Sequence, residues 1–147
     1  MPRAVVQLIF ISPTLLTSPK QRAFFSVYTD ALIERVTAEI GYEAVLSDIS
    51  YSIKSFENLG FRLKFTGYND KLHTFIRIFL TIMMSVRKHS GFDDLTIKLA
   101  VEKSLKAYKN MNVEVDQLNA NNRLIFLLDN IYHADLVIRE LESFDYS

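Results

Sequence analysis

The sequence contains no cysteine, and this absence excludes several kinds of site. Without thiols the chain can form no disulfide framework, no thiolate zinc centre and no cysteine nucleophile. Its four glycines are not clustered, so no glycine-rich loop is present to cradle a phosphate group. The formal net charge is zero, with 17 basic and 17 acidic residues and no block of either sign. Nucleic-acid binding needs a basic patch that neutralises phosphates, so we expect no nucleic-acid partner.

The sequence also lacks a hydrophobic run of membrane-spanning length. The apolar run over residues 4–11 is short, includes Gln7, and is followed by Pro13 instead of a small-residue cleavage site. We therefore interpret Ala4–Ser12 as a strand that is apolar on both faces, as in the centre of a sheet, and not as a signal peptide. The expected location is intracellular, with no membrane partner.

What is present indicates one globular domain over residues 1–147, because 49% of the residues are apolar and 12% are aromatic. The clearest element is a strand in which Phe61, Leu63 and Phe65 alternate with polar residues, the period expected when one face is buried. Before it, Asn58-Leu59-Gly60 predicts a turn with a positive φ that connects this strand to the one preceding it.

The segment Ser18-Pro19-Lys20-Gln21 predicts the start of a long helix, since serine is a good cap and proline suits the first helical position. This helix is expected to end near Thr37. We expect Gly41 to separate it from a short helix over residues 42–47. The side chains predicted to lie on its buried face are Phe24, Tyr28, Leu32 and Val36.

Further helices are predicted from apolar residues at helical spacing. They cover residues 70–88, a segment opened by Asp93-Asp94, residues 113–132 and a short segment from Asp135, with a loop at residues 110–112. The side chains expected to be buried in them include Leu72, Phe75, Phe79, Ile82, Leu95, Ile97, Leu99, Val101, Leu105, Tyr108, Leu124, Leu136 and Leu141. The order of elements indicates an α+β fold, with helices packed on one face of a small, mainly antiparallel sheet.

Three short runs in and beside the hairpin carry a family resemblance. They are Leu46-Ser47-Asp48-Ile49-Ser50-Tyr51, then Gly60-Phe61 with Leu63, and then Gly67-Tyr68-Asn69-Asp70-Lys71. Together they resemble the third, non-catalytic domain of insulysin-type zinc metallopeptidases of the insulinase family, and residues 2–13 are similar to that domain's first strand. The resemblance implies at least one further strand after this sequence ends. We therefore expect a domain truncated at its C-terminus, whose open sheet edge favours a homodimer.

Catalytic domains of this family carry H-x-x-E-H on the first long helix, where two histidines bind zinc and the glutamate is the general base. Residues 19–35 contain no histidine. We therefore predict no catalytic, cofactor-binding or metal-binding residue in this chain. His73, His89 and His133 lie on three separate predicted elements, which leaves a zinc bridging two copies as the remaining metal hypothesis.

Several polar residues have more than one interpretation. Core packing is favoured over a substrate surface for four tyrosines, Tyr51, Tyr68, Tyr108 and Tyr132. The polar sides of the hairpin face either a peptide chamber or solvent, and their basic residues are Lys54, Arg62 and Lys64. A shared helical face for Glu39 and Glu43 is not expected, because Gly41 lies between them.

The resemblance implies a structural role in a larger enzyme. The whole enzyme would be a zinc metalloendopeptidase that degrades peptides in a chamber made by two halves, and this domain would form part of the C-terminal wall. Its partners would be the other domains and the peptide substrate. Zinc would be bound elsewhere, so this chain alone is not expected to be an enzyme. The alternative is a stand-alone α+β protein-interaction module that shares the fold but has no peptidase half.

Overall fold

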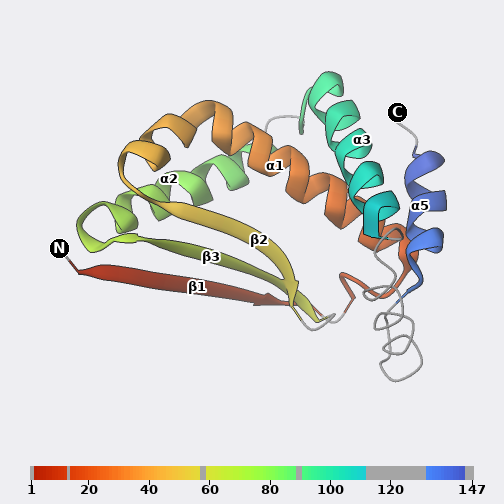
Figure 1. Ribbon diagram of the computed structural model, residues 1–147, viewed down its shortest axis with the longest axis horizontal. Helices are drawn as coiled ribbons and strands as arrows, with labels where there is room; N and C mark the ends of the chain where they lie inside the picture. Colours follow the sequence, from red (N-terminus) through yellow and green to blue (C-terminus); the bar gives the residue numbers. More distant parts are fainter. Residues whose placement is uncertain (1, 13, 57–58, 89–90, 112–131, 145–147) are drawn as a thin grey trace.

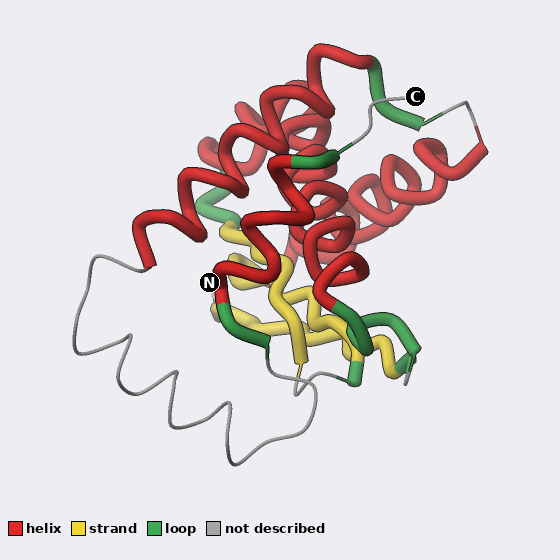
Figure 2. The backbone as a smooth tube through the Cα atoms, turned by 90° about the vertical axis from the view of Figure 1, so that its right-hand side faces the viewer, coloured by secondary structure: helices red, strands yellow, loops and turns green. Residues whose placement is uncertain are grey.

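One antiparallel sheet and a layer of helices over one of its faces make up the fold (Figure 1). The computed structural model describes residues 2–12, 14–56, 59–88, 91–111 and 132–144. Within these residues the strands are β1 (Arg3–Ile11), β2 (Ser50–Phe56) and β3 (Gly60–Tyr68). The helices are α1 (Pro19–Leu46), α2 (Asn69–Lys88), α3 (Asp94–Met111) and α5 (Ala134–Glu142). An end-on view shows the helices on one side of the strands, which confirms the predicted α+β fold (Figure 2).

β3 lies between β1 and β2 and is antiparallel to both. Phe65 pairs with Val6 of β1 and with Tyr51 of β2, and all three side chains belong to the core under the helices. Leu63 and Phe65 are fully buried, so the alternation predicted for this strand is confirmed.

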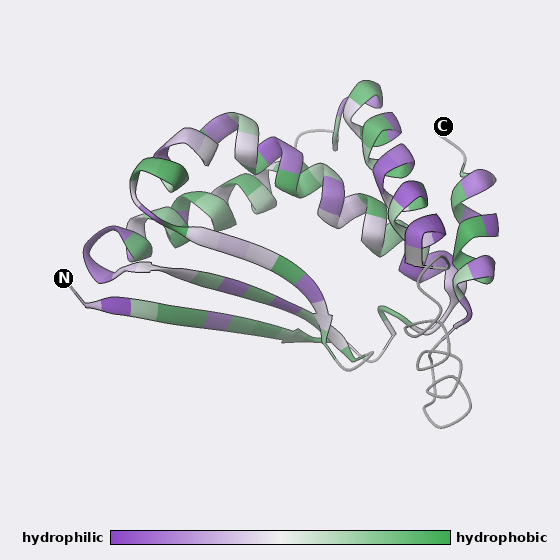
Figure 3. Ribbon diagram, viewed as in Figure 1, coloured by the Kyte–Doolittle hydropathy of each residue, from purple (hydrophilic) through white to green (hydrophobic). Residues whose placement is uncertain are grey.

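β1 is an edge strand among the described residues, and its predicted central position is wrong. Val6 and Leu8 pack against the core, whereas Val5 and Ile9 on the opposite face are 56% and 46% exposed. The strand is apolar along most of its length (Figure 3), but helices cover only one of its faces. Because most residues on both faces of this strand are apolar, the sequence does not indicate which face the helices cover.

Gly60, the first residue of β3, has a different role from the one predicted. Gly60 does not have a positive φ; the described residues that do are Asp48 and Gly91. Instead, Gly60 pairs with Ile11, and a Cβ at this position would lie 1.8 Å from the carbonyl oxygen of Phe10. Glycine therefore permits the close approach of β1 and β3. Asn58, the first residue of the predicted turn, lies outside the described residues.

α1 is a single helix of 28 residues that continues through Gly41. Its predicted start is confirmed, because the side chain of the cap residue Ser18 accepts a hydrogen bond of 3.2 Å from the backbone N–H of Gln21. The predicted end near Thr37 and the break at Gly41 are wrong. Beyond the glycine, Ala44 is buried in the core, so the helix continues despite the roughly 1 kcal/mol that a helical glycine costs.

The two halves of α1 pack against different elements and so connect two hydrophobic cores. In the second half, Leu32 and Val36 contact the sheet and α2. In the first half, Ala23, Val27 and Ala31 contact α3 and α5, which lie beyond the end of the sheet (Figure 1). α1 is therefore the element that positions the rest of the fold.

The predicted buried face of α1 is partly wrong as a result. Phe24 and Tyr28 are 48% and 39% exposed, whereas the neighbouring Ala23 and Val27 are buried. α3 and α5 approach α1 closely where its side chains are small. The aromatic ring of Phe24 is left at the rim, where it contacts Phe144 with the ring centroids 5.0 Å apart.

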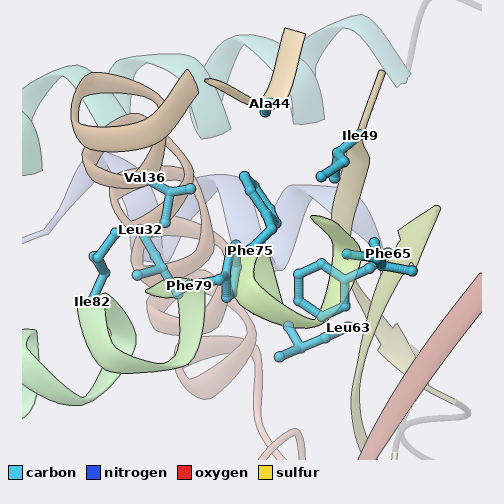
Figure 4. Packing of buried hydrophobic residues seen from close by; sticks show 10 residues of the cluster. Leu32, Val36, Ala44, Ile49, Leu63, Phe65, Phe75, Phe79 and Ile82 are labelled. Atoms are coloured by element: carbon cyan, nitrogen blue, oxygen red, sulfur yellow. The ribbon is translucent and has the colours of Figure 1, made fainter. Parts of the chain in front are cut away.

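The larger core lies between α1, α2 and the sheet (Figure 4). The ring of Phe79 in α2 meets that of Phe65 edge-on, at a centroid distance of 5.0 Å and an interplanar angle of 83°. The apolar face predicted for α2 is confirmed, and its buried members are Leu72, Phe75, Phe79 and Ile82. The opposite face is mostly polar, and none of the helices in the described ranges could cross a membrane.

The face of α3 that packs inward is partly the predicted one. Val101 is buried as predicted, and Ile97, Leu105 and Tyr108 pack against the same core. Leu95 and Leu99 are exposed instead of buried, and the neighbouring Ala100 is fully buried against α1. A small side chain at position 100 lets the backbones of α1 and α3 come close together. The need for a small residue here arises from the packing against α1, and the hydrophobic pattern of α3 does not indicate it.

The C-terminal elements also differ in detail. α3 extends to Met111, where a loop was predicted. In α5, Leu141 is buried as expected, but Val137 takes the inward position predicted for Leu136, which is exposed. Of the helix predicted over residues 113–132, all but the last residue lies outside the described part of the chain.

Candidate binding site

The described residues contain no group of three or more metal-ligating side chains. α1 is the long helix that follows the first strand, and it carries no histidine. His73 is exposed on α2, with Nε2 3.1 Å from the hydroxyl of Thr74. His133 caps α5, and its Nδ1 accepts a hydrogen bond of 3.3 Å from the N–H of Asp135. His89 lies outside the described residues, so the two described histidines each have a local partner on a different element.

Two carboxylates predicted to be separated do lie on one helix. Because α1 continues through Gly41, Glu39 and Glu43 are one turn apart, contrary to the prediction. Glu39 forms an exposed salt bridge with Arg35. A solvated pair of this kind contributes little stability and brings no acid–base chemistry with it.

The hairpin and core tyrosines have clear packing roles. Tyr51 contacts the ring of Phe79, and its hydroxyl lies 2.9 Å from the hydroxyl of Thr37. The ring of Tyr68 lies under the guanidinium group of Arg3 at 5.5 Å. Both rings are therefore part of the scaffold, and neither lines the two cavities described below.

A chain of hydrogen bonds connects α1 to α3. Ser26 donates to the hydroxyl of Ser104 at 2.9 Å, and Ser104 donates to a carboxylate oxygen of Asp30 at 2.6 Å. Lys103 lies 3.7 Å from Asp30 and 3.0 Å from Glu34, which balances the charge. Each hydroxyl is held as a donor and the chain ends on a carboxylate. The arrangement is a cross-link between the two helices.

Beside this cross-link is a cavity of about 330 Å³ between the start of α1, the end of β2 and the last turns of α3. Among the described residues its lining combines an apolar wall, hydroxyl groups and two basic residues. The residues are Leu16, Phe25 and Ile53; Ser26, Thr29, Ser55 and Tyr108; and Arg22 and Lys54.

Arg22 is half-buried and its guanidinium group lies 5.6 Å above the ring of Tyr132. Tyr132 in turn donates a hydrogen bond to the backbone carbonyl of Thr17, just before α1. Burial lowers the pKa of Arg22, and the nearby tyrosines oppose this effect, but an arginine stays protonated at neutral pH. Burial also raises the pKa of Tyr108, so its phenol is neutral and can donate a hydrogen bond.

The basic residues of the hairpin do not all share one environment. Lys54 pairs with Arg62 across the ladder, and Lys64 pairs with Ser52, on the face of the sheet turned away from the helices. Lys54 also lines the cavity, at the end of β2. Lys64 is exposed and does not line it.

A second cavity of about 340 Å³ is more apolar, and the described residues that line it are all uncharged. It lies on the other side of Phe25, which lines both cavities. The exposed rings of Phe24 and Tyr28 form part of its wall.

Sequence reasoning did not find the first cavity. One signal was available, because Arg22, Ser26 and Thr29 are spaced four and three residues apart and so share a helical face. The other contributors, Lys54 and Tyr108, come from segments that approach only in the folded chain.

The comparisons with known proteins concern the whole fold. A sequence model of one protein family, described as the middle or third domain of peptidase M16, matches residues 1–137. The chain belongs to this family. It is the non-catalytic middle domain of an insulinase-type metallopeptidase, as the resemblance in the hairpin region implied.

A relative and a solved structure agree with the family. The chain is 33% identical over 108 residues to "Putative zinc protease mug138" of Schizosaccharomyces pombe, a match that covers 74% of the chain and 11% of the relative. The crystal structure of the periplasmic protease PqqL from Escherichia coli has the same fold. Its TM-score is 0.66 at 14% identity, over 98% of this chain and 16% of that one. The chain thus spans a small part of the length of each protein.

Proposed function

We propose that this chain is a structural wall domain of a zinc metalloendopeptidase that encloses peptides in a chamber formed by two halves. The match of residues 1–137 to a middle domain carries the proposal. The composition of α1 supports it, because none of its 28 residues is a histidine, although this helix follows the first strand as the zinc helix does in catalytic domains of the family. The zinc and the general base then belong to another domain of the same enzyme.

The partners of the chain in this proposal are the other domains of the enzyme and the peptide confined between them. The chain itself holds no zinc and breaks no peptide bond. Its role is structural. The layer formed by α1 and the sheet limits the size of the enclosed peptide and presents a surface to neighbouring domains.

The first test measures peptide cleavage and bound zinc in the purified 147-residue chain. We expect neither zinc at stoichiometric level nor cleavage above buffer, with or without a chelator. Substantial cleavage that a chelator abolishes would overturn the proposal. The second test is the sequence of the transcript upstream of residue 1, where we expect H-x-x-E-H with a further glutamate downstream.

Exposed apolar residues favour a wall domain over a self-contained interaction module. Tyr42, Val45 and Leu46 lie together at the end of α1 and are all exposed. Patches of this kind mark surfaces that another protein or domain covers. We expect the isolated chain to bind a dye specific for exposed apolar surface, and the variant Val45→Ser to bind less of it. Cooperative melting without dye binding would favour the module instead.

A further inference from the structure

We propose that the face of the sheet turned away from the helices binds an acidic peptide segment that carries an apolar residue close to its carboxylates. The inference rests on the side chains that β1, β3 and β2 place on this face. It is independent of the peptidase proposal, because a wall domain and a stand-alone module present the same face.

Charge is the first argument. The three strands contain no aspartate or glutamate. Lys54 of β2 lies directly opposite Arg62 of β3, and Lys64 follows two residues later on the same face. Like charges that face each other across a ladder repel, so this arrangement weakens the hairpin. None of the three side chains forms a salt bridge with a residue that the structure describes, and an anionic partner offsets their repulsion.

Protection of a sheet edge does not explain the cluster. Charged side chains on an edge strand oppose pairing with another chain. Arg62 and Lys64, however, lie on β3, which has β1 on one side and β2 on the other. A strand that is paired along both sides needs no such protection, and attraction of an anion is the role that matches the charge of these two residues.

A row of aliphatic side chains borders the cations and defines the second property of the partner. Val5, Ile9 and Ile11 of β1 are all exposed. Ile9 pairs with Arg62, at the spacing of about 4.8 Å between neighbouring strands. A partner that covers both strands therefore has carboxylates and an apolar group close together. Single-stranded nucleic acids instead stack their bases on aromatic rings, so an aliphatic row favours a peptide.

The spacing along β3 defines the order of residues in the partner. Arg62 and Lys64 are two residues apart, about 7 Å, and alternate side chains of an extended peptide have the same spacing. Two acidic residues at alternate positions can therefore meet both cations. The next alternate position comes beside Ile11 in one direction of the peptide and beside Val5 in the other. An apolar residue suits this position in either direction.

The test is an NMR titration of the 147-residue chain at low ionic strength with a blocked pentapeptide. The peptide has glutamate at its first and third positions, leucine at its fifth and serine elsewhere. We expect saturable shifts for the amides of residues 5–11 and 60–66, and weaker binding as salt is added, since the charges are exposed. Glutamine in place of both glutamates should abolish the shifts, and serine in place of leucine should lower the affinity.

Two double variants with the same chemical change test the location of the site. Lys54→Gln combined with Lys64→Gln removes two cations from the face and should weaken binding about tenfold, the loss of two exposed ion pairs. Lys98→Gln combined with Lys106→Gln removes the same charge from α3, where both lysines are exposed, and should leave binding unchanged. Circular dichroism of both variants checks that they are folded.

The proposal is overturned if the peptide without glutamate, or the peptide without leucine, binds the wild type as tightly as the original peptide. It is also overturned if the two double variants weaken binding equally. A single-stranded oligonucleotide with the same charge as the peptide should bind more weakly. Tighter binding of the oligonucleotide to residues 60–66 would overturn the preference for a peptide and with it the proposal.

Discussion

Ser104 of α3 donates a hydrogen bond of 2.6 Å to Asp30 of α1, a residue 74 positions earlier in the chain. Ser104 is fully buried, and its own oxygen accepts from Ser26. It is a buried polar contact in an interface that also contains small and branched apolar side chains and the salt bridges of Lys103 to Asp30 and Glu34. Such a hydrogen bond has a narrow range of favourable geometries, so it helps to determine how α3 sits along α1 beside the first cavity.

Replacing Ser104 with alanine should lower the free energy of unfolding by about 1.5–3 kcal/mol, because a buried hydrogen bond to a charged group is lost and Ser26 loses its acceptor. Urea denaturation followed by circular dichroism measures the change. Ser26→Ala is the matched control. It removes one neutral hydrogen bond and should cost about 0.5–1.5 kcal/mol. Equal losses of stability in the two variants would show that the hydrogen bond to Asp30 contributes no more to the free energy of unfolding than the bond from Ser26.

In the larger core, Phe79→Ala should cost about 3–5 kcal/mol, since a fully buried ring in contact with Phe65 is deleted. The neighbouring Ile78 is 40% exposed on the same helix, and Ile78→Ala should cost about 1 kcal/mol or less. Thermal and urea unfolding of both variants provide the comparison. Similar losses at the two positions would contradict the orientation of α2.

Gly60→Ala should disrupt the end of the β1–β3 ladder, because its Cβ would lie 1.8 Å from the carbonyl oxygen of Phe10. Gly91→Ala is the control, since Gly91 has a φ of 82° but open space around it. That variant should lose only the 1–2 kcal/mol or so that left-handed backbone costs an alanine. We expect a larger loss of stability at Gly60, with faster hydrogen exchange of the β1 amides. A smaller loss at Gly60 would refute the close approach.

Acid should weaken the start of α3. Asp93 accepts hydrogen bonds from the hydroxyl and the N–H of Thr96, and the hydroxyl bond is the main reason that the pKa of Asp93 lies below its usual value. A lowered folded-state pKa stabilises the protein above the unfolded-state value of about 3.9 and loses this effect as the pH falls through the folded-state pKa. Asp93→Asn keeps a capping oxygen but does not titrate. Urea midpoints measured from pH 5 to pH 2.5 should fall more steeply for the wild type than for this variant, and parallel slopes would contradict the assignment.

The open side of β1 should support self-association. Among the described residues β1 pairs only with β3, and Val5 and Ile9 are exposed beside its free edge. We expect light scattering to show dimers at high concentration and Val5→Lys to shift the chain toward monomer, since a charge on an edge strand opposes pairing. Val45→Lys makes the same change on α1 and should leave the mass unchanged. A monomeric wild type at every concentration would count against an association through this edge.

Signals that depend only on neighbours in the chain predicted their elements well. The cap at Ser18, the alternation of Leu63 and Phe65 in β3 and the apolar face of α2 all appear in the structure as expected. Each follows from backbone geometry that repeats every two or 3.6 residues. The family resemblance was also a local signal, because it depended on short runs around the hairpin.

Sequence patterns did not predict the features that depend on contact with a distant segment of the chain. A glycine at position 41 has a cost in a helix that local reasoning detects, but the burial of Ala44 that offsets it depends on the sheet. Phe24 is more hydrophobic than Ala23, yet Ala23 faces inward because α3 and α5 need a close approach. The cavity was missed for the same reason, since Arg22 and Lys54 lie on elements that meet only after folding.

The sequence by itself determined the chemistry that is absent and the family to which the chain belongs. Without cysteine, and with no histidine in α1, it has no thiolate and no zinc motif on that helix, whatever its packing. Tertiary structure decided which faces are covered, where the edge of the sheet lies and which residues line the two cavities. The physical reason is that periodicity and residue type are properties of neighbours along the chain. The burial of a residue and the electrostatic field around it depend instead on the distant segments that folding places next to it.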